Sequence, residues 1–268
     1  MTNKPIMERV YEHYIESLEH FDKDQIVICA LQGSQNYRLD LPTSDVDTKL
    51  IVVPSFKDIA LARKPVSTTH IRANEEHTDW KDIRLYIETF RKQNLNFLEI
   101  LFSPFVYVNP VYKDQWDRLV AARERIARMN PVRAVKSMKG IAMEKYHAME
   151  HKYPSKVDII DKYGYDCKQL HHLIRVDNFL TRYIAGEAYE SCMIPDEAMR
   201  KFLLDIKTNK YDLATARNLA EMSLSHIERI SAEFCAQHPE EEDEEMRQLL
   251  EDVSYNIMKI AVAKELNV

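Results

Sequence analysis

The stretch LQGSQNYRLDLPTSDVDTKLIVV, residues 31–53, places two polar motifs close together beside apolar runs. Asp45 and Asp47 stand one residue apart at the start of the second run. If this run is a strand, residues i and i+2 point to the same face of its sheet. Two carboxylates on one face repel each other and raise each other's pKa unless a positive charge lies between them. The pattern therefore predicts a cation-binding site.

The composition indicates an ordinary globular protein. The chain has 268 residues, of which 45% are hydrophobic and 30% charged, and its formal net charge is −6. An acidic chain argues against a protein that coats duplex DNA, although a local basic groove stays compatible with a nucleic-acid substrate. The four cysteines lack CxxC spacing, as in reduced cytosolic proteins. With neither a signal peptide nor an apolar membrane-spanning segment, we expect a cytoplasmic protein without a membrane partner.

The first hundred residues alternate between strand and helix patterns. An apolar stripe at helical spacing predicts a helix over residues 5–20, and short apolar runs predict buried strands over 25–32 and 46–54. Residues 55–64 form a short helix by pattern, with Ser55 as N-cap and Asp58 in a weak capping box. Residues 78–93 begin extended and become helical near Arg84, and a buried helical turn follows at 95–103.

Beyond about Asn109 the strand patterns disappear and long helical patterns follow, punctuated by prolines. Acidic residues in the run 239–248 are placed to start the last helix, where the helix dipole favours them. The sequence therefore predicts an N-terminal α/β (α+β) domain over residues 1–108 and an all-helical domain over 109–268.

Gly33 and Ser34 come directly after the first buried strand. A glycine at a strand end permits close backbone approach, and the following turn offers N–H groups and a hydroxyl to phosphate oxygens. A Gly-Ser turn alone is a weak signal, but here Ser-Asp-Val-Asp opens the next strand roughly ten residues later. Nucleotidyl transfer from a triphosphate needs such a phosphate clamp, together with carboxylates that hold Mg²⁺. A third carboxylate on a neighbouring strand would complete the metal site.

The segments GSQNY and SDVDTKLIVVPSF resemble the signature motifs of the DNA polymerase β-type nucleotidyltransferase superfamily, Gly-Ser followed by Asp-x-Asp. The closer resemblance is to the predicted bacterial and phage nucleotidyltransferases of the RNA-repair-associated polymerase β family. It extends through KPVSTTH, EHTDWKDIR and QNLNFLEILFS, and resumes at YGYDCKQLHHLIR and AGEAY. Most of residues 27–105 and about 163–189 are covered. The resemblance implies a small mixed sheet in the N-terminal domain.

In that superfamily the first two aspartates bind metal, and the resemblance assigns this role here to Asp45 and Asp47. The third carboxylate is Asp79 or Asp82. We prefer Asp79 because it lies in the extended part of its segment, where it would face the pair, whereas Asp82 could cap the helix or pair with Arg84. The family usually has glycine where this sequence has Arg38, which either restricts the backbone of the loop or adds a cation near the triphosphate.

Lys168, His172 and Arg175 follow at i, i+4 and i+7, which places three basic groups on one stripe of a helix. They are either a solvated face paired with nearby acids or a clamp for phosphates across a cleft. The matching family segment shows the same pattern, so we favour the clamp, with Gly33 and Ser34 binding the other side of the nucleotide.

The leading hypothesis is a Mg²⁺-dependent nucleotidyltransferase, with Mn²⁺ as a substitute metal and a nucleoside triphosphate as substrate. The family association implies an RNA 3′ end as acceptor. Two alternatives stay open. One is transfer to a small molecule or a protein side chain, as in antibiotic-modifying or toxin–antitoxin enzymes, and the other is a catalytically silent nucleotide-binding protein.

Overall fold

The computed structural model describes residues 4–267, and these fall into two compact units. The sheet unit contains the described residues up to Asn36, together with Asp40–Met129 and the segment from Glu242 onward. The helical unit contains Tyr37–Leu39 and Asn130–Glu241. The expected boundary at residues 108/109 therefore differs from the structural division, in which two segments beyond residue 108 belong to the sheet unit.

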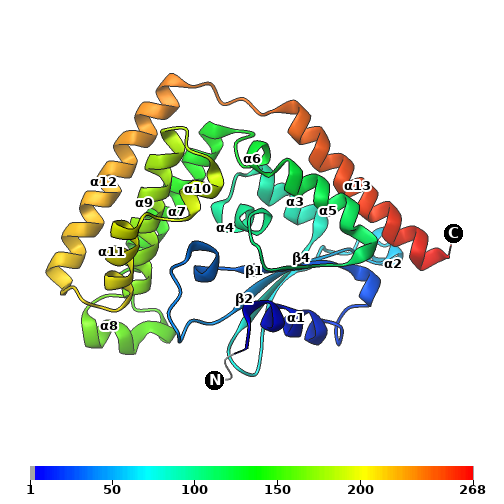
Figure 1. Cartoon of the computed structure of the whole chain (residues 1–268), viewed down its shortest axis with the longest axis horizontal. Coiled ribbons are helices and arrows are strands. Elements are labelled where there is room, and N and C mark those ends of the chain that lie inside the picture. Colours follow the sequence, from blue (N-terminus) through cyan, green and yellow to red (C-terminus); the bar gives the residue numbers. More distant parts are fainter. Residues whose placement is uncertain (1–3, 268) are drawn as a thin grey trace. The chain divides into compact units, whose positions relative to one another are not determined.

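The sheet unit is built on five strands in the order β3-β4-β2-β1-β5. Figure 1 labels three of these strands, β1, β2 and β4. β2 and β4 run parallel and the other neighbours are antiparallel, so the sheet is mixed, as expected. Two strands were not predicted from the sequence, β3 and β5. The strands span β1 Ile26–Gln32, β2 Asp47–Val52, β3 Ser67–Ile71, β4 His77–Asp82 and β5 Val106–Val108.

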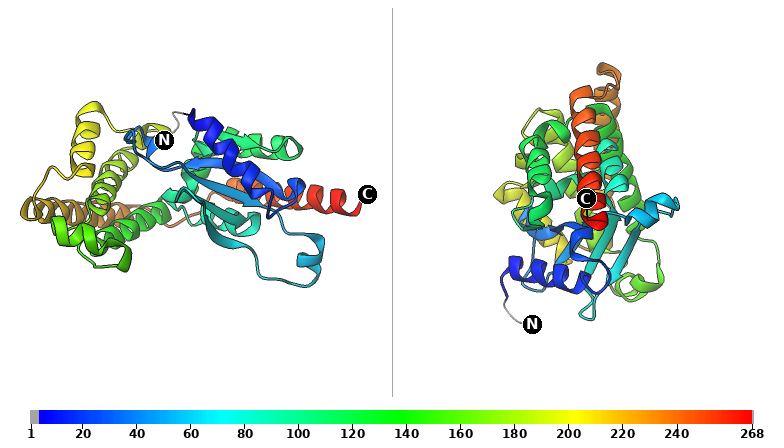
Figure 2. Two further views of the ribbon diagram at one scale, coloured as in Figure 1. Left: turned by 90° about the horizontal axis from the view of Figure 1, so that it is seen from below. Right: turned by 90° about the vertical axis from the view of Figure 1, so that its right-hand side faces the viewer.

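Helices pack on both faces of this sheet. Helix α1 (Ile6–Ser17) packs along one face of the sheet (Figure 2). Its residues Val10 and Tyr14 are buried there against β1, β2 and β5. On the other face lie α3 (Ile83–Arg91) and α4 (Leu95–Leu98). The capping box of Ser55 and Asp58 is present at the start of α2, and the chain changes from strand to helix at residues 82–83, as predicted. The remaining helices of the unit are α2 Phe56–Ala60, α5 Lys113–Ala121, α6 Arg123–Ile126 and α13 Glu244–Leu266.

Helix α13 accounts for one of the two segments beyond residue 108 that belong to the sheet unit. It begins after the N-cap Asp243, within the predicted acidic run, and packs against α3 and α5 of the sheet unit. Its buried residues repeat at helical spacing, and this pattern shows a packing face without showing its partner. Those residues are Met246, Leu250, Val253, Ile257 and Ala261.

The helical unit is organised around α9 (Cys167–Ile184), which contacts α7, α10, α11 and α12. Aspartate N-caps begin several of these helices, including Asp166 for α9 and Asp212 for α12. No helix among the described residues is both long and apolar enough to span a bilayer. The other helices are α7 Pro131–Ala148, α8 Val157–Tyr163, α10 Tyr189–Met193, α11 Glu197–Lys207 and α12 Leu213–Gln237.

Candidate active site

The two motifs of the opening stretch meet at one end of the sheet. Gln32, the last residue of β1, pairs with Asp47, the first residue of β2. Three residues after Gln32, the side chain of Gln35 donates a hydrogen bond from Nε2 to the carbonyl oxygen of Asp45, at 2.6 Å. The Gly-Ser turn and the Asp-x-Asp pair are therefore neighbours in space as well as in sequence.

The Gly-Ser turn has a conformation that favours glycine. Gly33 has φ of +97°, and Ser34–Tyr37 form a 3₁₀ turn in which the N–H of Asn36 bonds to the carbonyl of Gly33. The N–H of Gly33 donates to Oε1 of the buried Glu99, at 3.2 Å. Glu99 lies in the predicted helical turn at 95–103, but its contact with Gly33 spans 66 residues and has no local signal.

One sheet face carries Asp47, Lys49 and Asp79. Asp79 on β4 pairs with Lys49 on the parallel strand β2, and alternation along β2 puts Asp47 on the face of Lys49. The side chains of Asp47 and Asp79 are each 31% exposed. The structure thus places Asp79, the preferred third carboxylate, on the same face as the first strand-borne aspartate.

Asp82 lies on the opposite face and is buried. It is the N-cap of α3, accepts the N–H of Arg84 at 2.9 Å, and forms an ion pair with the guanidinium of Arg84 at 2.6 Å. These are the two structural roles that the sequence offered for Asp82. The assignment of Asp79 as the catalytic member stays a prediction.

Lys49 is a further candidate site residue, which the sequence reasoning missed. Its ammonium group is nearly buried, lies 3.3 Å from Oδ2 of Asp79 and stands 4.3 Å from the centre of the Phe97 ring. Burial lowers the pKa of Lys49, while Asp79 opposes that shift. A period-two count from Asp47 would have placed this lysine on the same face, because it is two residues further along the strand.

Asp79 is held in its ionised form. Burial opposes ionisation, but the Lys49 cation and hydrogen bonds from Thr69, Lys49 and Gln32 keep the pKa of Asp79 below its usual value. The Thr69 hydroxyl donates to Oδ1 at 2.6 Å. The carboxylate oxygens of Asp79 are ligands of the kind that Mg²⁺ prefers. One of them, Oδ2, is already in contact with the ammonium group of Lys49.

The fit to a metal ion is incomplete in this conformation. Asp45 is exposed, and its carbonyl rather than its carboxylate contacts Gln35. Asp47 uses Oδ1 to accept the N–H of His77 at 2.9 Å. Within residues 4–267, no three or more Asp, Glu, His or Cys side chains are gathered as a ready metal site. The donor chemistry suits Mg²⁺, whereas the convergence of Asp45, Asp47 and Asp79 on one ion stays a prediction.

The basic stripe of α9 is not uniform. Lys168 is exposed, His172 is partly buried, and Arg175 is buried with its guanidinium 4.1 Å from the centre of the Tyr37 ring. Burial, followed by the Arg175 cation, lowers the pKa of His172 well below its usual value, so His172 is neutral at pH 7. The three residues therefore do not present three equivalent cations.

Further cations hold the segment that follows the Gly-Ser turn. Arg200 donates to the carbonyl of Arg38, and Lys207 donates to the carbonyl of Leu39, each at 2.8 Å. Arg38 has φ of +57°, the left-handed conformation that the family's glycine would adopt without strain. The departure at this position thus changes the residue but keeps a glycine-like backbone.

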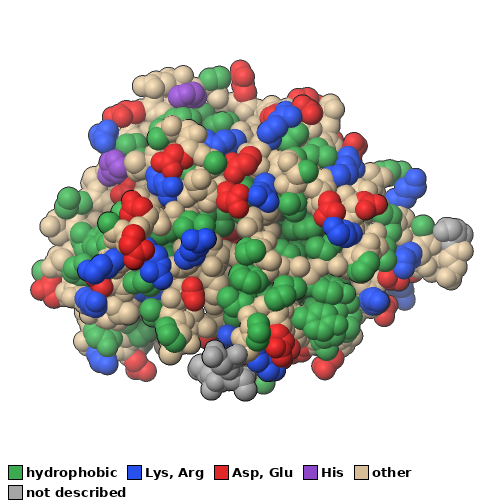
Figure 3. Space-filling model, viewed as in Figure 1, with side chains coloured by type: hydrophobic (Ala, Val, Ile, Leu, Met, Phe, Trp, Pro, Cys, Tyr) green, Lys and Arg blue, Asp and Glu red, His purple; other side chains and the backbone are tan. Residues whose placement is uncertain are grey.

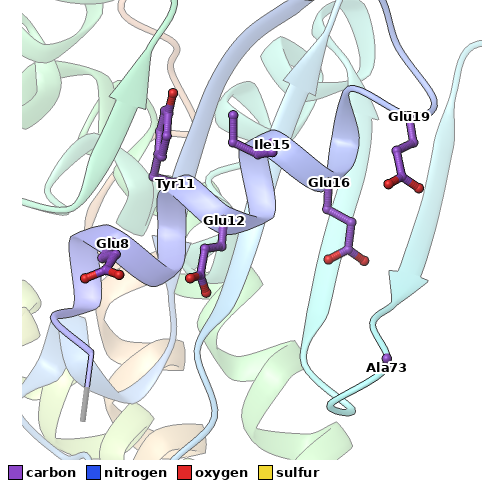
Figure 4. Close-up of a pocket in the computed structure, with 7 residues that line it drawn as sticks. All are labelled: Glu8, Tyr11, Glu12, Ile15, Glu16, Glu19 and Ala73. Carbon is purple, nitrogen blue, oxygen red and sulfur yellow. The ribbon is translucent and has the colours of Figure 1, made fainter. Parts of the chain in front are cut away.

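A shallow hollow on α1 does not suit a triphosphate. Four glutamates border it, and their carboxylates would repel phosphate groups (Figure 4). Elsewhere, the face drawn in Figure 3 shows basic and acidic side chains interspersed. The hollow is lined by Glu8, Tyr11, Glu12, Ile15, Glu16, Glu19 and Ala73.

A Gly-Ser turn and an Asp-x-Asp pair at one end of a small mixed sheet are the arrangement of a polymerase β-type nucleotidyltransferase domain. Comparison with known families makes the assignment specific. Residues 7–188 match the RNA repair pathway DNA polymerase beta family, and the chain belongs to this family. No curated protein matched the chain.

Proposed function

We propose that the protein is a metal-dependent nucleotidyltransferase, which moves a nucleoside monophosphate from a triphosphate to an acceptor hydroxyl. The observation that carries the proposal is the meeting of the two motifs: Gln35 bonds to Asp45, and Asp79 shares a sheet face with Asp47. The family assignment supports the same chemistry.

The proposed roles follow from the position of each group. The hydroxyl and the N–H of Ser34 bind oxygens of the β- and γ-phosphates, while the Gly33 N–H stays bonded to Glu99. Asp45, Asp47 and Asp79 hold Mg²⁺ or Mn²⁺, which when bound neutralises phosphate charge and favours ionisation of the acceptor hydroxyl. The acceptor hydroxyl loses its proton to water, its oxygen forms a bond to the α-phosphorus, the bond to the bridging oxygen of the β-phosphate breaks, and pyrophosphate leaves.

The proposed acceptor is an RNA 3′ end. Support comes from the family's description as part of an RNA repair pathway. Lys168 and Arg175 would contribute contacts to phosphate groups, whereas the neutral His172 would donate at most a hydrogen bond.

The test is to incubate the full chain with each α-labelled nucleoside triphosphate, Mg²⁺ or Mn²⁺, and a panel of acceptors. We expect label on RNA together with release of pyrophosphate. Label on a small molecule or a protein would replace RNA as the acceptor. If triphosphates bind but label reaches no acceptor in the panel and no pyrophosphate is released, a silent nucleotide-binding protein becomes the better description.

A further inference from the structure

A buried carboxylate supports the Asp-x-Asp turn. Glu76 is 2% exposed, and its Oε1 accepts the N–H of Val46 at 3.1 Å. Val46 is the residue between the two predicted metal ligands. The next residue, His77, donates its own N–H to Asp47. Glu76 and His77, at the start of β4, therefore bind Val46 and Asp47, at the start of β2.

Glu76 is itself held on several sides. Its Oε2 accepts hydrogen bonds from Asn74 at 2.8 Å and Arg72 at 2.9 Å, and lies 3.0 Å from Nε2 of His13. Arg9 forms an ion pair with the same carboxylate. A buried carboxylate with this many donors has little freedom to rotate, because each rotation would leave a buried charge without partners.

The same network reaches both strands. Nδ1 of His13 lies 2.9 Å from the hydroxyls of Thr48 and of Thr78, which follow Asp47 on β2 and His77 on β4. His13 belongs to α1 and is buried. The network thus fixes the start of β2 to the start of β4 and to the helix behind them.

We infer that Glu76 is a positioning residue, which sets the backbone of the Asp45–Asp47 turn so that its carboxylates can bind a divalent cation. The inference rests on the proposed function. Asp45 is exposed and its carboxylate has no described role in the fold, so the backbone of the turn is what determines where it points. Loss of groups that orient metal ligands typically weakens metal binding by about 10–100-fold.

Two substitutions separate the effect of the length of the Glu76 side chain from the effect of its charge. Glu76→Asp keeps the charge for Arg9 and Arg72 but withdraws the oxygen from Val46. Glu76→Gln loses the charge but keeps an oxygen that can accept the Val46 N–H. Glu16→Gln is the matched control, because Glu16 also bonds to Arg72, at 2.7 Å, without touching the turn.

The readout is Mn²⁺ binding to the full chain without nucleotide, followed by the EPR signal of free Mn²⁺. We expect the Kd to rise about tenfold or more in Glu76→Asp and to stay within about threefold of wild type in Glu76→Gln and Glu16→Gln. Hydrogen exchange of the Val46 amide should become faster in Glu76→Asp alone. Thermal unfolding of each variant shows whether its loss of Mn²⁺ affinity is accompanied by a loss of stability.

Wild-type affinity and wild-type Val46 exchange in Glu76→Asp would overturn the inference, and so would an equal loss of affinity in Glu16→Gln. Failure of the proposed function looks different. A wild-type chain that binds Mn²⁺ but transfers no nucleotide contradicts the proposed function and leaves the comparison of variants readable. A wild-type chain that binds no Mn²⁺ without nucleotide overturns the inference, and the transfer assay then decides the proposed function by itself.

Discussion

The two faces of strands β2 and β4 treat polar groups in opposite ways. On one face Asp47 and Asp79 are each 31% exposed, and the Lys49 cation lies 3.3 Å from Asp79. On the other face His13, Thr48 and Thr78 are buried and bonded to one another. Charged groups that keep access to solvent can exchange one partner for another, whereas a buried and fully bonded network resists change.

This contrast separates groups that bind ligands from groups that hold the fold. Removing a charge from the face of Asp47 and Asp79, which solvent reaches, should change activity more than stability. Removing a polar group from the opposite, buried face should change stability first, because the partners left behind are buried. The following predictions test that division, from the largest expected effect to the smallest.

The largest effect is expected at the metal ligands. Asp45→Asn or Asp47→Asn should lower the rate of nucleotidyl transfer by more than ~100-fold, beyond the usual cost of losing an outer partner of a metal ligand. Stability should be unchanged or slightly increased, since like charges are relieved in the metal-free protein. Single-turnover rates and chemical denaturation measure the two quantities. Asp40→Asn, at an exposed acid of the same segment, is the control. Activity retained with Mg²⁺ as the only metal would rule out these ligands.

Asp79 and Asp82 give the sharpest comparison between the faces. Asp79→Asn should reduce turnover much more than nucleotide affinity, because Asp45 and Asp47 would still hold the metal–triphosphate complex. Asp82→Asn should leave turnover near normal and cost roughly 1–2 kcal/mol of stability, since its ion pair with Arg84 is lost while asparagine still caps α3. Nucleotide titration and single-turnover rates should be measured side by side. The opposite result would move the catalytic role from Asp79 to Asp82.

The same division between exposed and partnered charge recurs on α9. Lys168 is exposed, so Lys168→Ala should weaken triphosphate binding about tenfold and leave stability unchanged. Arg175 is buried against Tyr37, so Arg175→Ala should lower stability by about 2 kcal/mol in addition to any loss of affinity. Calorimetric titration and denaturation measure both, with the exposed Lys201→Ala as control. Unchanged nucleotide affinity in both variants would make the stripe a structural feature.

The smallest effect concerns Arg38. Its left-handed backbone is strained for any residue with a Cβ, so Arg38→Gly should raise the free energy of unfolding by about 0.5–1 kcal/mol. Arg38→Ala keeps the Cβ and is the control. An equal gain in both variants would attribute the effect to loss of the arginine side chain rather than to the backbone.

The parts of the fold that the sequence predicted depend on local signals. Apolar runs located β1 and β2, the Ser55–Asp58 pair marked the start of α2, and the switch from period two to helical spacing located the start of α3. β3 was not predicted because its residues, STTHI, are mostly exposed and lack apolar alternation. β5 has only three residues, too few for a periodicity.

The sequence indicated the candidate site only where its residues belong to one short stretch. Gly33, Ser34, Asp45 and Asp47 stood out together, and the contacts of the adjacent Gln35 with Asp45 and of Gln32 with Asp47 agree with their expected proximity. Glu76 and Glu99 did not, because their importance lies in contacts with backbone groups 30 and 66 residues away. Lys49 could have been found from its spacing to Asp47 alone. The choice between Asp79 and Asp82 as third carboxylate depended on the register of β4 against β2, which the sequence does not give.

The way the chain passes between its two units has a practical consequence for making fragments. The sheet unit is interrupted by Tyr37–Leu39 and by Asn130–Glu241, and the residues that flank the longer segment are in contact, since the N–H of Asp243 bonds to the carbonyl of Met129. A truncation after residue 108 or 129 would therefore remove α13 and expose the apolar surfaces of α3 and α5 on which it packs. An internal deletion that joins residue 129 to residue 242 through a short linker would keep that helix. For this protein, the smallest fragment that preserves the Asp-x-Asp strand is a spliced chain rather than a shortened one.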